Sequence, residues 1–446
     1  MSRWTRIRPR TGRHLDVRSP LARLEWGTAG RHRRRVRRGL IAGGVVAVLA
    51  AGAAVWFVFF RGSGGGATPV QTSQPACASA RLPGRLGTLA LVEDGKLEVQ
   101  SLDSCASQTL VRKSVKGPAR FSADGQWIAF GNGTTLPIAA TTLPSPGGLH
   151  PWQWSSTGHV IVGVDAKKGT VLLGNAGHAQ PVPGPHDAGS AAMDPKGRFV
   201  AVGVKNKVEL FPVGGGAGKV LFSGPSKTRV RIQGWSPDGK WVLFWDLDPG
   251  ATTGPLDVAP ISGAGYHNIF DPVPAYDDFL TWCGDTLVAS GGGGDIVSEG
   301  QQLLVSQAPG WQTHDLSRDF RSSWIWPACS PKGQWIAVTV TPNHSEFPPG
   351  QGERRVELIS TNGRKRVRLQ LGAGVFEVPQ WSADGRTLLV IKRRLDPKFG
   401  GTVELVRINP KNGKVLKTVT DVATLPSVKT PKGHTEWSSI LDWYRG

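Results

Sequence analysis

The run Trp235-Ser236-Pro237-Asp238-Gly239-Lys240, followed by the apolar stretch Trp241–Phe244, decides the predicted fold of this chain. Ser, Pro, Asp and Gly in succession form a tight turn, in which the glycine takes the positive φ that other residues resist. The aromatic residue before the turn ends one strand. The apolar run after it suits a second strand that packs between neighbouring sheets. The segment therefore predicts a β-hairpin.

Related runs return through most of the chain, with starting positions 33 to 52 residues apart. They begin at Phe121, Trp154, Met193, Trp235, Cys329 and Trp381, and a degenerate copy begins at Trp282. A further strand is expected after most of them, at Lys96–Val99, Thr170–Leu173, Lys207–Phe211, Arg355–Ile359 and Thr402–Ile408. A period of roughly 40–50 residues is typical of propeller blades of four short strands. The sequence thus predicts an all-β fold, a β-propeller.

The two ends of the repeat region complement each other. Gly87–Leu102 has the later strands of a blade without an opening motif, and Thr435–Ser439 has an opening without its continuation. Strands from both ends are expected to share one blade, which would leave no exposed sheet edge. Seven starts and this split unit predict eight blades. Seven blades are the alternative, because the copy at Trp282 is irregular.

The repeat resembles that of TolB-like, WD-type propellers, whose characteristic run is W-S-P-D-G-K before an apolar strand. Trp235–Lys240 matches that run in full, whereas other copies place Lys196 or Lys332 where the Asp belongs, or Thr157 at the third position. The resemblance covers roughly residues 86–445 and implies the fold. It implies little about function, because such propellers include binding scaffolds, periplasmic envelope proteins and domains attached to peptidases.

The N-terminal part of the chain predicts a membrane anchor. Residues 39–60 are 22 uncharged residues, enough for a helix to cross a hydrocarbon core of roughly 30 Å. Residues 1–38 contain 13 Arg and only two acidic residues, so this tail should stay in the cytoplasm. The prediction is a single-pass cell-membrane protein with an extracytoplasmic C-terminal domain. A cleaved signal peptide is the alternative, and it would have a shorter basic start.

Four regions follow from this interpretation: a disordered arginine-rich tail (1–38), a transmembrane helix (39–60), a flexible Gly/Ser/Pro tether (61–76) and the propeller (77–446). The tail is expected to lie near anionic lipid headgroups. More than half of the net charge of +20 lies in the tail, and no DNA-binding motif spacing occurs there. No nucleic acid is therefore expected as a partner, although docking of a cytoplasmic partner or nucleic acid on the tail is an alternative.

All four cysteines, Cys77, Cys105, Cys283 and Cys329, fall in the region expected outside the cytoplasm. An even number of cysteines in an oxidising compartment favours disulfides. We favour the pairs Cys77–Cys105 and Cys283–Cys329 among three possible connectivities, the second joining adjacent blades at nearly equivalent motif positions. No CxxC or nearby His pattern indicates a metal site.

Polar and aromatic residues outside the motif supply the candidate site. The stretch 245–279 is interpreted as a loop inserted in the blade of Trp235, with carboxylates that could bind a cation or a basic partner. The motif tryptophans are expected in the blade cores, whereas tryptophans outside the motif are candidates for exposed contacts. The candidate binding residues are Asp246, Asp248, Asp271, Asp277, Asp278, Trp311, Trp324 and Trp326.

No linear catalytic motif is present: the sequence has no GxSxG elbow, no HExxH and no phosphate-loop spacing. We therefore assign no catalytic residue, metal ligand or cofactor. The favoured function is a membrane-anchored binding or scaffold propeller for an envelope protein or glycan. The alternative is an extracytoplasmic enzyme, polysaccharide-cleaving or quinone-dependent, whose residues are gathered from several blades.

Overall fold

The structure of the protein is a computed structural model. It describes residues 86–93, 95–104, 106–112, 115, 119–131, 134–137, 149–156, 158, 160–165, 167–175, 178–293, 300–317, 321–342, 354–372, 374–393, 401–425 and 441–444. The chain divides into two units, residues 1–71 and 72–446, and all described residues belong to the second. The predicted tail, membrane segment and tether therefore lie outside the described residues.

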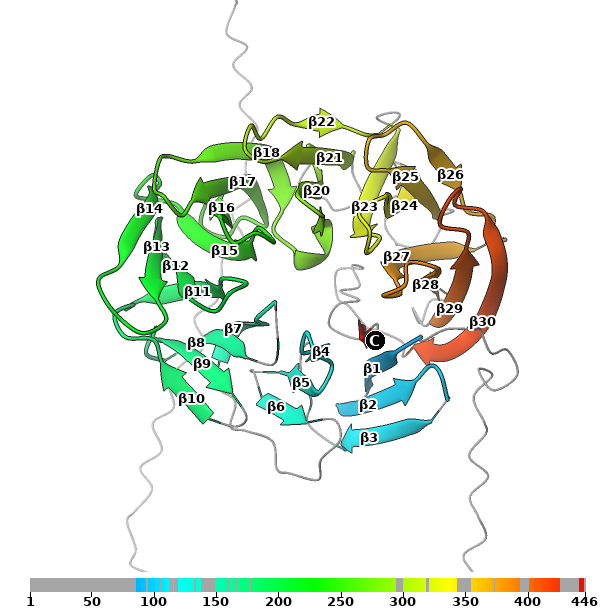
Figure 1. Ribbon diagram of the computed structural model, residues 1–446, viewed down its shortest axis with the longest axis horizontal. Helices are drawn as coiled ribbons and strands as arrows, with labels where there is room; N and C mark the ends of the chain where they lie inside the picture. Colours follow the sequence, from blue (N-terminus) through cyan, green and yellow to red (C-terminus); the bar gives the residue numbers. More distant parts are fainter. Residues whose placement is uncertain are drawn as a thin grey trace, which may run out of the picture. The chain divides into compact units, whose positions relative to one another are not determined.

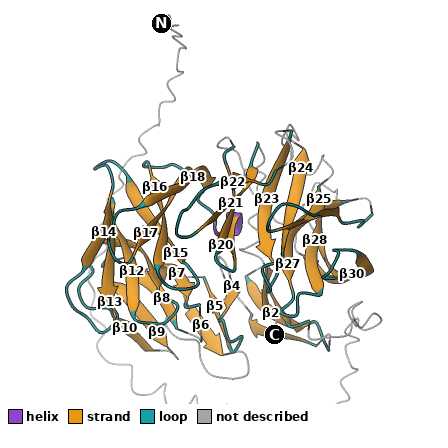
Figure 2. Ribbon diagram, turned by 45° about the horizontal axis from the view of Figure 1, so that its top comes forward, coloured by secondary structure: helices purple, strands orange, loops and turns teal. Residues whose placement is uncertain are grey.

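The described residues form eight antiparallel sheets arranged as blades around a centre, so the eight-bladed prediction is confirmed (Figure 1). Strands make up almost all of the regular structure. One short 3-10 helix, Asp277–Phe279, comes directly before the strand that begins at Leu280 (Figure 2). Seven of the described sheets have four strands, and the second blade has three.

The strands of each blade are given below with their bounds, from the innermost strand to the outermost. Blade 1 contains β31 (Leu441–Tyr444), β1 (Thr88–Glu93), β2 (Lys96–Ser101) and β3 (Ser107–Val111). Blade 2 contains β4 (Ala119–Phe121), β5 (Trp127–Phe130) and β6 (Thr134–Pro137). Blade 3 contains β7 (Leu149–Trp154), β8 (Ile161–Asp165), β9 (Val171–Asn175) and β10 (His178–Pro181). Blade 4 contains β11 (Ala188–Met193), β12 (Phe199–Val204), β13 (Lys207–Pro212) and β14 (Lys219–Ser223).

The second half of the ring repeats the pattern. Blade 5 contains β15 (Arg229–Trp235), β16 (Trp241–Leu247), β17 (Thr253–Pro260) and β18 (His267–Pro274). Blade 6 contains β19 (Leu280–Cys283), β20 (Thr286–Gly291), β21 (Gln302–Gln307) and β22 (His314–Asp315). Blade 7 contains β23 (Ser322–Cys329), β24 (Trp335–Pro342), β25 (Arg355–Ser360) and β26 (Arg366–Arg368). Blade 8 contains β27 (Val375–Trp381), β28 (Thr387–Arg393), β29 (Gly401–Ile408) and β30 (Val415–Leu425).

Hydrogen bonds inside the repeated turn explain why the motif recurs. The Ser236 hydroxyl donates to Asp238 Oδ1 (2.6 Å) and accepts from the backbone N–H of Trp241 (3.0 Å). Asp238 Oδ1 also accepts the N–H of Lys240 (3.0 Å), and Gly239 has a φ of +71°. The turns that begin at Ser122 and Ser382 repeat this arrangement. Ser, Asp and Gly are thus the residues that fix the hairpin between the two innermost strands of a blade.

The motif tryptophans join neighbouring blades. The indole N–H of Trp235 donates to the carbonyl of Ala192 (3.0 Å), and that of Trp381 donates to the carbonyl of Ala328 (3.1 Å). Trp154 donates to the carbonyl of Arg120 in the same way (2.9 Å). Each acceptor directly precedes the motif's first residue in the preceding blade. Trp235 and Trp381 are buried as predicted, whereas Trp154 is partly buried.

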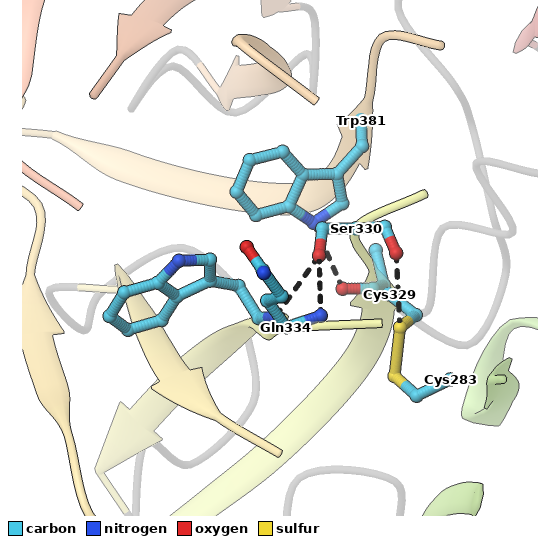
Figure 3. The surroundings of a disulfide bond; sticks show 7 residues. Cys283, Cys329, Ser330, Gln334 and Trp381 are labelled. Atoms are coloured by element: carbon cyan, nitrogen blue, oxygen red, sulfur yellow. Dashed lines mark hydrogen bonds between the residues drawn. A yellow bond between two sulfur atoms is a disulfide. The ribbon is translucent and has the colours of Figure 1, made fainter. Parts of the chain in front are cut away.

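A disulfide joins blades 6 and 7, where Cys329 occupies the motif position of the tryptophan. Cys283 and Cys329 are bonded, with 5.3 Å between their Cα atoms, and the bond lies close to Ser330 and the Trp381 indole (Figure 3). The predicted pair Cys283–Cys329 is therefore confirmed. Cys77 and Cys105 lie outside the described residues, so their pairing stays a prediction.

The ring closes through one blade shared by both ends of the propeller. β31 pairs antiparallel with β1, with Leu441 opposite Leu91 and Tyr444 opposite Thr88. Figure 1 shows the C-terminal end beside β1, the first described strand. Closure by both ends is confirmed. The closing strand begins at Leu441, a few residues beyond the predicted Thr435–Ser439, which lies outside the described residues.

Candidate functional site

A cavity of about 220 Å³ lies among the innermost strands of blades 1, 2, 6, 7 and 8. Five separate parts of the chain contribute to its wall, so closure of the ring is required to assemble it. The lining residues are Arg120, Asp278, Leu280, Thr281, Trp326, Pro327, Ala328, Cys329, Val378, Pro379, Gln380, Leu441 and Asp442. We refer to this site as the central cavity.

One position of the repeat supplies a lining residue in each of these five blades. Arg120, Thr281, Ala328, Gln380 and Asp442 each directly precede the first motif residue or its equivalent, and all five line the central cavity. Side chains alternate between the two sides of a strand. A residue next to an aromatic that packs against one neighbouring blade therefore points toward the opposite neighbour, as Gln153 does with the carbonyl of Ala191 and Asp442 with the N–H of Phe121.

Two residues of the cavity wall have a strained backbone. Trp326 has a φ of 55° and Val378 a φ of 46°, a region that is sparsely populated for large or β-branched residues. Both lie at irregularities in the strand pairing of β23 and β27, and each is followed by a proline. Backbone strain of this kind is found at ligand-binding and active sites more often than elsewhere. The strain therefore favours a functional role for the central cavity.

Surrounding contacts hold the polar groups of the cavity in place. Asp442 Oδ2 accepts the backbone N–H of Phe121 (2.7 Å), which fixes this carboxylate between blades 1 and 2. The Arg354 guanidinium lies 5.7 Å from the ring centroid of Trp326 and pairs with the buried Glu377. The charged residues of the wall are one arginine, Arg120, and two aspartates, Asp278 and Asp442. The cavity thus offers both signs of charge and the amide of Gln380 to a polar ligand.

Two of the eight candidate binding residues, Asp278 and Trp326, line the central cavity. The other polar residues of the wall, Arg120, Thr281, Gln380 and Asp442, were missed by the sequence interpretation. Arg120, Thr281 and Gln380 could have been found from the sequence, because each directly precedes the first residue of a motif copy, whereas Asp442 precedes no copy that the sequence shows. Asp277 is in the short 3-10 helix, but its side chain lies outside the described part of the structure.

The predicted exposure of Trp311, Trp324 and Trp326 is wrong, because their side chains are only 4%, 1% and 5% exposed. Trp311 packs edge-on against Trp241, with ring centroids 5.2 Å apart. Trp324 lies beneath the Arg366 guanidinium, 4.8 Å from it, within the core shared by blades 6 and 7. Packing between blades buries these rings although none of them belongs to the motif.

The interpretation of residues 245–279 as an inserted loop is also wrong. This stretch forms the end of β16, the whole of β17 and β18, and the short 3-10 helix. Asp246 lies on β16, Asp271 on β18 and Asp248 in the turn after β16. Asp278 lines the central cavity, whereas Asp246, Asp248 and Asp271 do not. Of these acidic residues, Asp246 and Asp271 belong to ordinary blade strands, and they do not form one inserted loop.

A further aspartate, Asp257 on β17, lies close to this acidic group. Its side chain accepts a hydrogen bond from the amide of Asn268 (2.8 Å) and is 3% exposed. Burial, with smaller contributions from Asp246 and Asp271, raises the pKa of Asp257 to about 6. Burial also raises the pKa of Asp246, helped by Asp248. Within the part of the chain that the structure describes, no group of three or more His, Cys, Asp or Glu side chains can hold a metal ion.

We expect Asp257→Asn to stabilise the propeller at pH 8 by up to about 3 kcal/mol and to have little effect near pH 3. Below pH 4 the carboxyl is protonated in both the folded and the unfolded chain. Between pH 4 and 6 it ionises only in the unfolded chain, so stability falls as the pH rises. Denaturant unfolding at several pH values measures this. Asp248→Asn, at an exposed residue, is the control, and equal effects of the two substitutions would contradict the prediction.

Among the described residues, no helix is long and apolar enough to span a membrane. Residues 39–60, the predicted membrane segment, lie outside them. Anchoring of the chain in a membrane therefore stays a prediction.

No family model and no curated protein matches the sequence. Solved structures with a similar fold include dipeptidyl peptidase 4 of Porphyromonas gingivalis, at 12% identity, over 80% of this chain and 62% of that chain, with a TM-score of 0.50. A dihydro-heme d1 dehydrogenase matches at 15% identity over 85% of both chains, with a TM-score of 0.49. TolB of Acinetobacter baumannii matches at 14% identity over 67% of both chains, with a TM-score of 0.34.

These similarities show the fold alone. The chain is an eight-bladed β-propeller, and TolB proteins are among the solved structures similar to it. Propellers with such low identity carry unrelated functions, so the function has to be argued from the central cavity.

Proposed function

We propose that the protein is a membrane-anchored, extracytoplasmic binding propeller that holds an envelope protein or glycan through a polar group seated in the central cavity. The observation that supports this most is the convergence on one cavity of Arg120, Gln380 and Asp442 from three blades and of Asp278 from the short 3-10 helix. The strained residues Trp326 and Val378 in the same wall add to it.

The size of the cavity favours a large partner that inserts one group. Pockets that enclose a whole small molecule usually measure about 300–1,000 Å³. The central cavity, at about 220 Å³, is smaller. It suits a side chain, a chain end or one sugar substituent, while the rest of the partner contacts the surrounding surface.

The disulfide supports the extracytoplasmic location in this proposal. Stable disulfides form in oxidising compartments and are rare in the cytoplasm. Cys283 and Cys329 are bonded within the propeller. Together with the arginine-rich residues 1–38 and the uncharged residues 39–60, this favours a tail inside the cell and a propeller outside it.

Affinity capture from the cell envelope with the full chain tests the binding function. The variant is Asp278→Ala, and Asp285→Ala is the matched control, because Asp285 is exposed in the turn of the same blade. The unchanged chain and the control should retain the same partner, and the cavity variant should retain about ten-fold less, since a hydrogen bond to a charged group contributes about 1.5–3 kcal/mol. Equal retention by both variants would contradict the proposal.

The alternative function, cleavage of a polysaccharide, has one observation in its favour. Asp278 and Asp442 both line the central cavity, and glycoside hydrolysis commonly uses two carboxylates. Turnover of an envelope glycan that is abolished by Asp278→Asn and by Asp442→Asn, but not by Asp285→Asn, would favour the enzyme. Stable retention of that glycan without cleavage would favour the binding propeller.

A further inference from the structure

Four turns of blades 7 and 8 lie side by side at one face of the propeller. In each blade one turn joins the first strand to the second and another joins the third to the fourth, and both lie at the same face because the strands are antiparallel. The Trp335 indole N–H of blade 7 donates to the carbonyl of Pro410 in blade 8 (2.7 Å). Within each blade, the N–H groups of Thr361 (3.3 Å) and Ile408 (2.8 Å) donate to the first turn of the same blade. One surface therefore contains the turns 330–334, 361–365, 382–386 and 409–414.

Exposed basic side chains crowd this surface, whereas Asp384 is the single acidic residue in the four turns. Within the described part of the chain, none of these basic side chains forms an ion pair. Asp285 and Asp315 of blade 6 lie on the same side of the ring, and even with them the cations outnumber the carboxylates. We call this the basic turn surface, and its six cations are Lys332, Arg364, Lys365, Arg386, Lys411 and Lys414.

The acidic residues outside the described part of these blades belong to the other face by connectivity. The strand ends that flank residues 343–353, 394–400 and 426–440 lie at the face opposite the turns, so the acidic residues of these stretches join the propeller there. The stretches that join blade 1 at the turn face, residues 61–85 and 445–446, contain arginines and no acidic residue. The excess of positive charge is thus a property of the turn face.

The described chain begins at this same face, in blade 1. The innermost strands end at the turn face, and the first residue of β1 lies opposite Tyr444, the last residue of the innermost strand β31. Leu86, just before β1, accepts the Trp443 indole N–H (2.7 Å). Blade 1 adjoins blade 8 in the ring (Figure 1). Residues 61–85 link this point to the predicted membrane segment, and a flexible chain of that length spans roughly 25–30 Å. The basic turn surface is therefore within reach of a membrane that holds residues 39–60.

We propose that the basic turn surface lies on the anionic headgroups of the membrane that anchors the chain, an inference that rests on the membrane anchoring in the proposed function. Basic residues near an anionic lipid surface are attracted to it over about a Debye length. Leu416, directly after the turn 409–414 and its first strand residue, is 57% exposed. An apolar side chain beside basic ones favours a lipid surface over a soluble polyanion. The basic turn surface shares no residue with the central cavity, so the two can be occupied together.

Quenching by lipid in vesicles that contain the full chain tests the contact. A fluorescent amino acid replaces Ala383, exposed in a turn of the surface, or Gln370, exposed at the opposite face, and the lipid headgroups carry a spin-label quencher. The two faces are separated by strands such as β24, whose eight residues span roughly 26 Å. Phosphatidylglycerol added to phosphatidylcholine should raise quenching at position 383 and leave position 370 unchanged. Sodium chloride at about 0.5 M should reverse the rise, because it screens the attraction.

Charge variants assign the effect to the turns. Lys411→Gln/Lys414→Gln should lower the equilibrium constant for docking about five-fold for each lysine removed. Lys167→Gln/Lys168→Gln is the matched control, because both lysines are exposed in the turn between β8 and β9 at the opposite face. The control should dock as the unchanged chain does.

Flotation of the chain with neutral vesicles tests the anchor separately from the docking. A chain that floats with them, but whose quenching at position 383 ignores phosphatidylglycerol or falls equally in both double variants, would overturn the docking and leave the anchor standing. A chain that fails to float would overturn both. Release of the surface from the vesicles by less poly(glycerol phosphate) than there is lipid phosphate would also overturn the docking, since a soluble polyanion would then be the preferred partner.

Discussion

Replacing Glu377 with alanine is expected to lower the free energy of unfolding by about 3–5 kcal/mol. Glu377 is fully buried on β27 and pairs with both Arg354 and Arg393, which are 7% and 3% exposed. Removing the carboxylate leaves two guanidinium groups buried without their shared counter-charge. The cost of leaving a charge buried and unpaired exceeds what the pair itself contributes.

Guanidinium chloride unfolding followed by tryptophan fluorescence measures the effect. Glu93→Ala is the matched control, because Glu93 is exposed at the end of β1, and its effect should stay within about 0.5 kcal/mol. A loss below about 1 kcal/mol in Glu377→Ala would show that the two arginines find other partners. The buried arrangement of charges beside the central cavity would then be incorrect.

The second large effect concerns the covalent link between blades 6 and 7. The double variant Cys283→Ala/Cys329→Ala should lose about 2–4 kcal/mol, since the bond closes a loop between residues 46 apart and restricts the unfolded chain. It also removes the link at the place where other blades are joined by a tryptophan indole. Denaturant midpoints of the oxidised chain and the variant measure the difference.

Substitution is a better test than chemical reduction here, because a reductant would also act on any bond between Cys77 and Cys105. The corresponding variant at Cys77 and Cys105 serves as the comparison. Peptide mapping under non-reducing conditions verifies that Cys283 is bonded to Cys329 in the unchanged chain. A double variant as stable as the unchanged chain would mean that the link contributes nothing to the joining of blades 6 and 7.

Local chemistry made the fold predictable. Ser236, Asp238 and Gly239 form a turn through hydrogen bonds with one another and with the nearby backbone, so the same letters recur wherever the hairpin recurs. The count of eight blades and closure by both ends followed from counting these turns. Strands such as Lys207–Phe211 were placed to within a residue or two because their apolar runs lie between recognisable turns.

Contacts between distant segments made the site harder to predict. Arg120 and Asp442 line the same cavity only because the ring closes, and neither belongs to a motif. The spacing from Trp235 to Trp282 was interpreted as containing an insertion, yet β16, β17 and β18 and their turns account for it. Trp324 was expected at the surface for lack of a motif, but packing between blades 6 and 7 buries it.

Site-specific photo-crosslinking in intact cells tests the central claim, that a partner occupies the central cavity, most directly. A diazirine-bearing amino acid replaces Gln380 in the cavity wall of the full chain, and in a control chain it replaces Thr109, exposed on the outer strand β3. We expect a light-dependent adduct with one envelope protein or glycan at position 380 and none at position 109. Adducts at position 109 alone, or none at position 380 while the chain is folded and present in the membrane, would contradict the account.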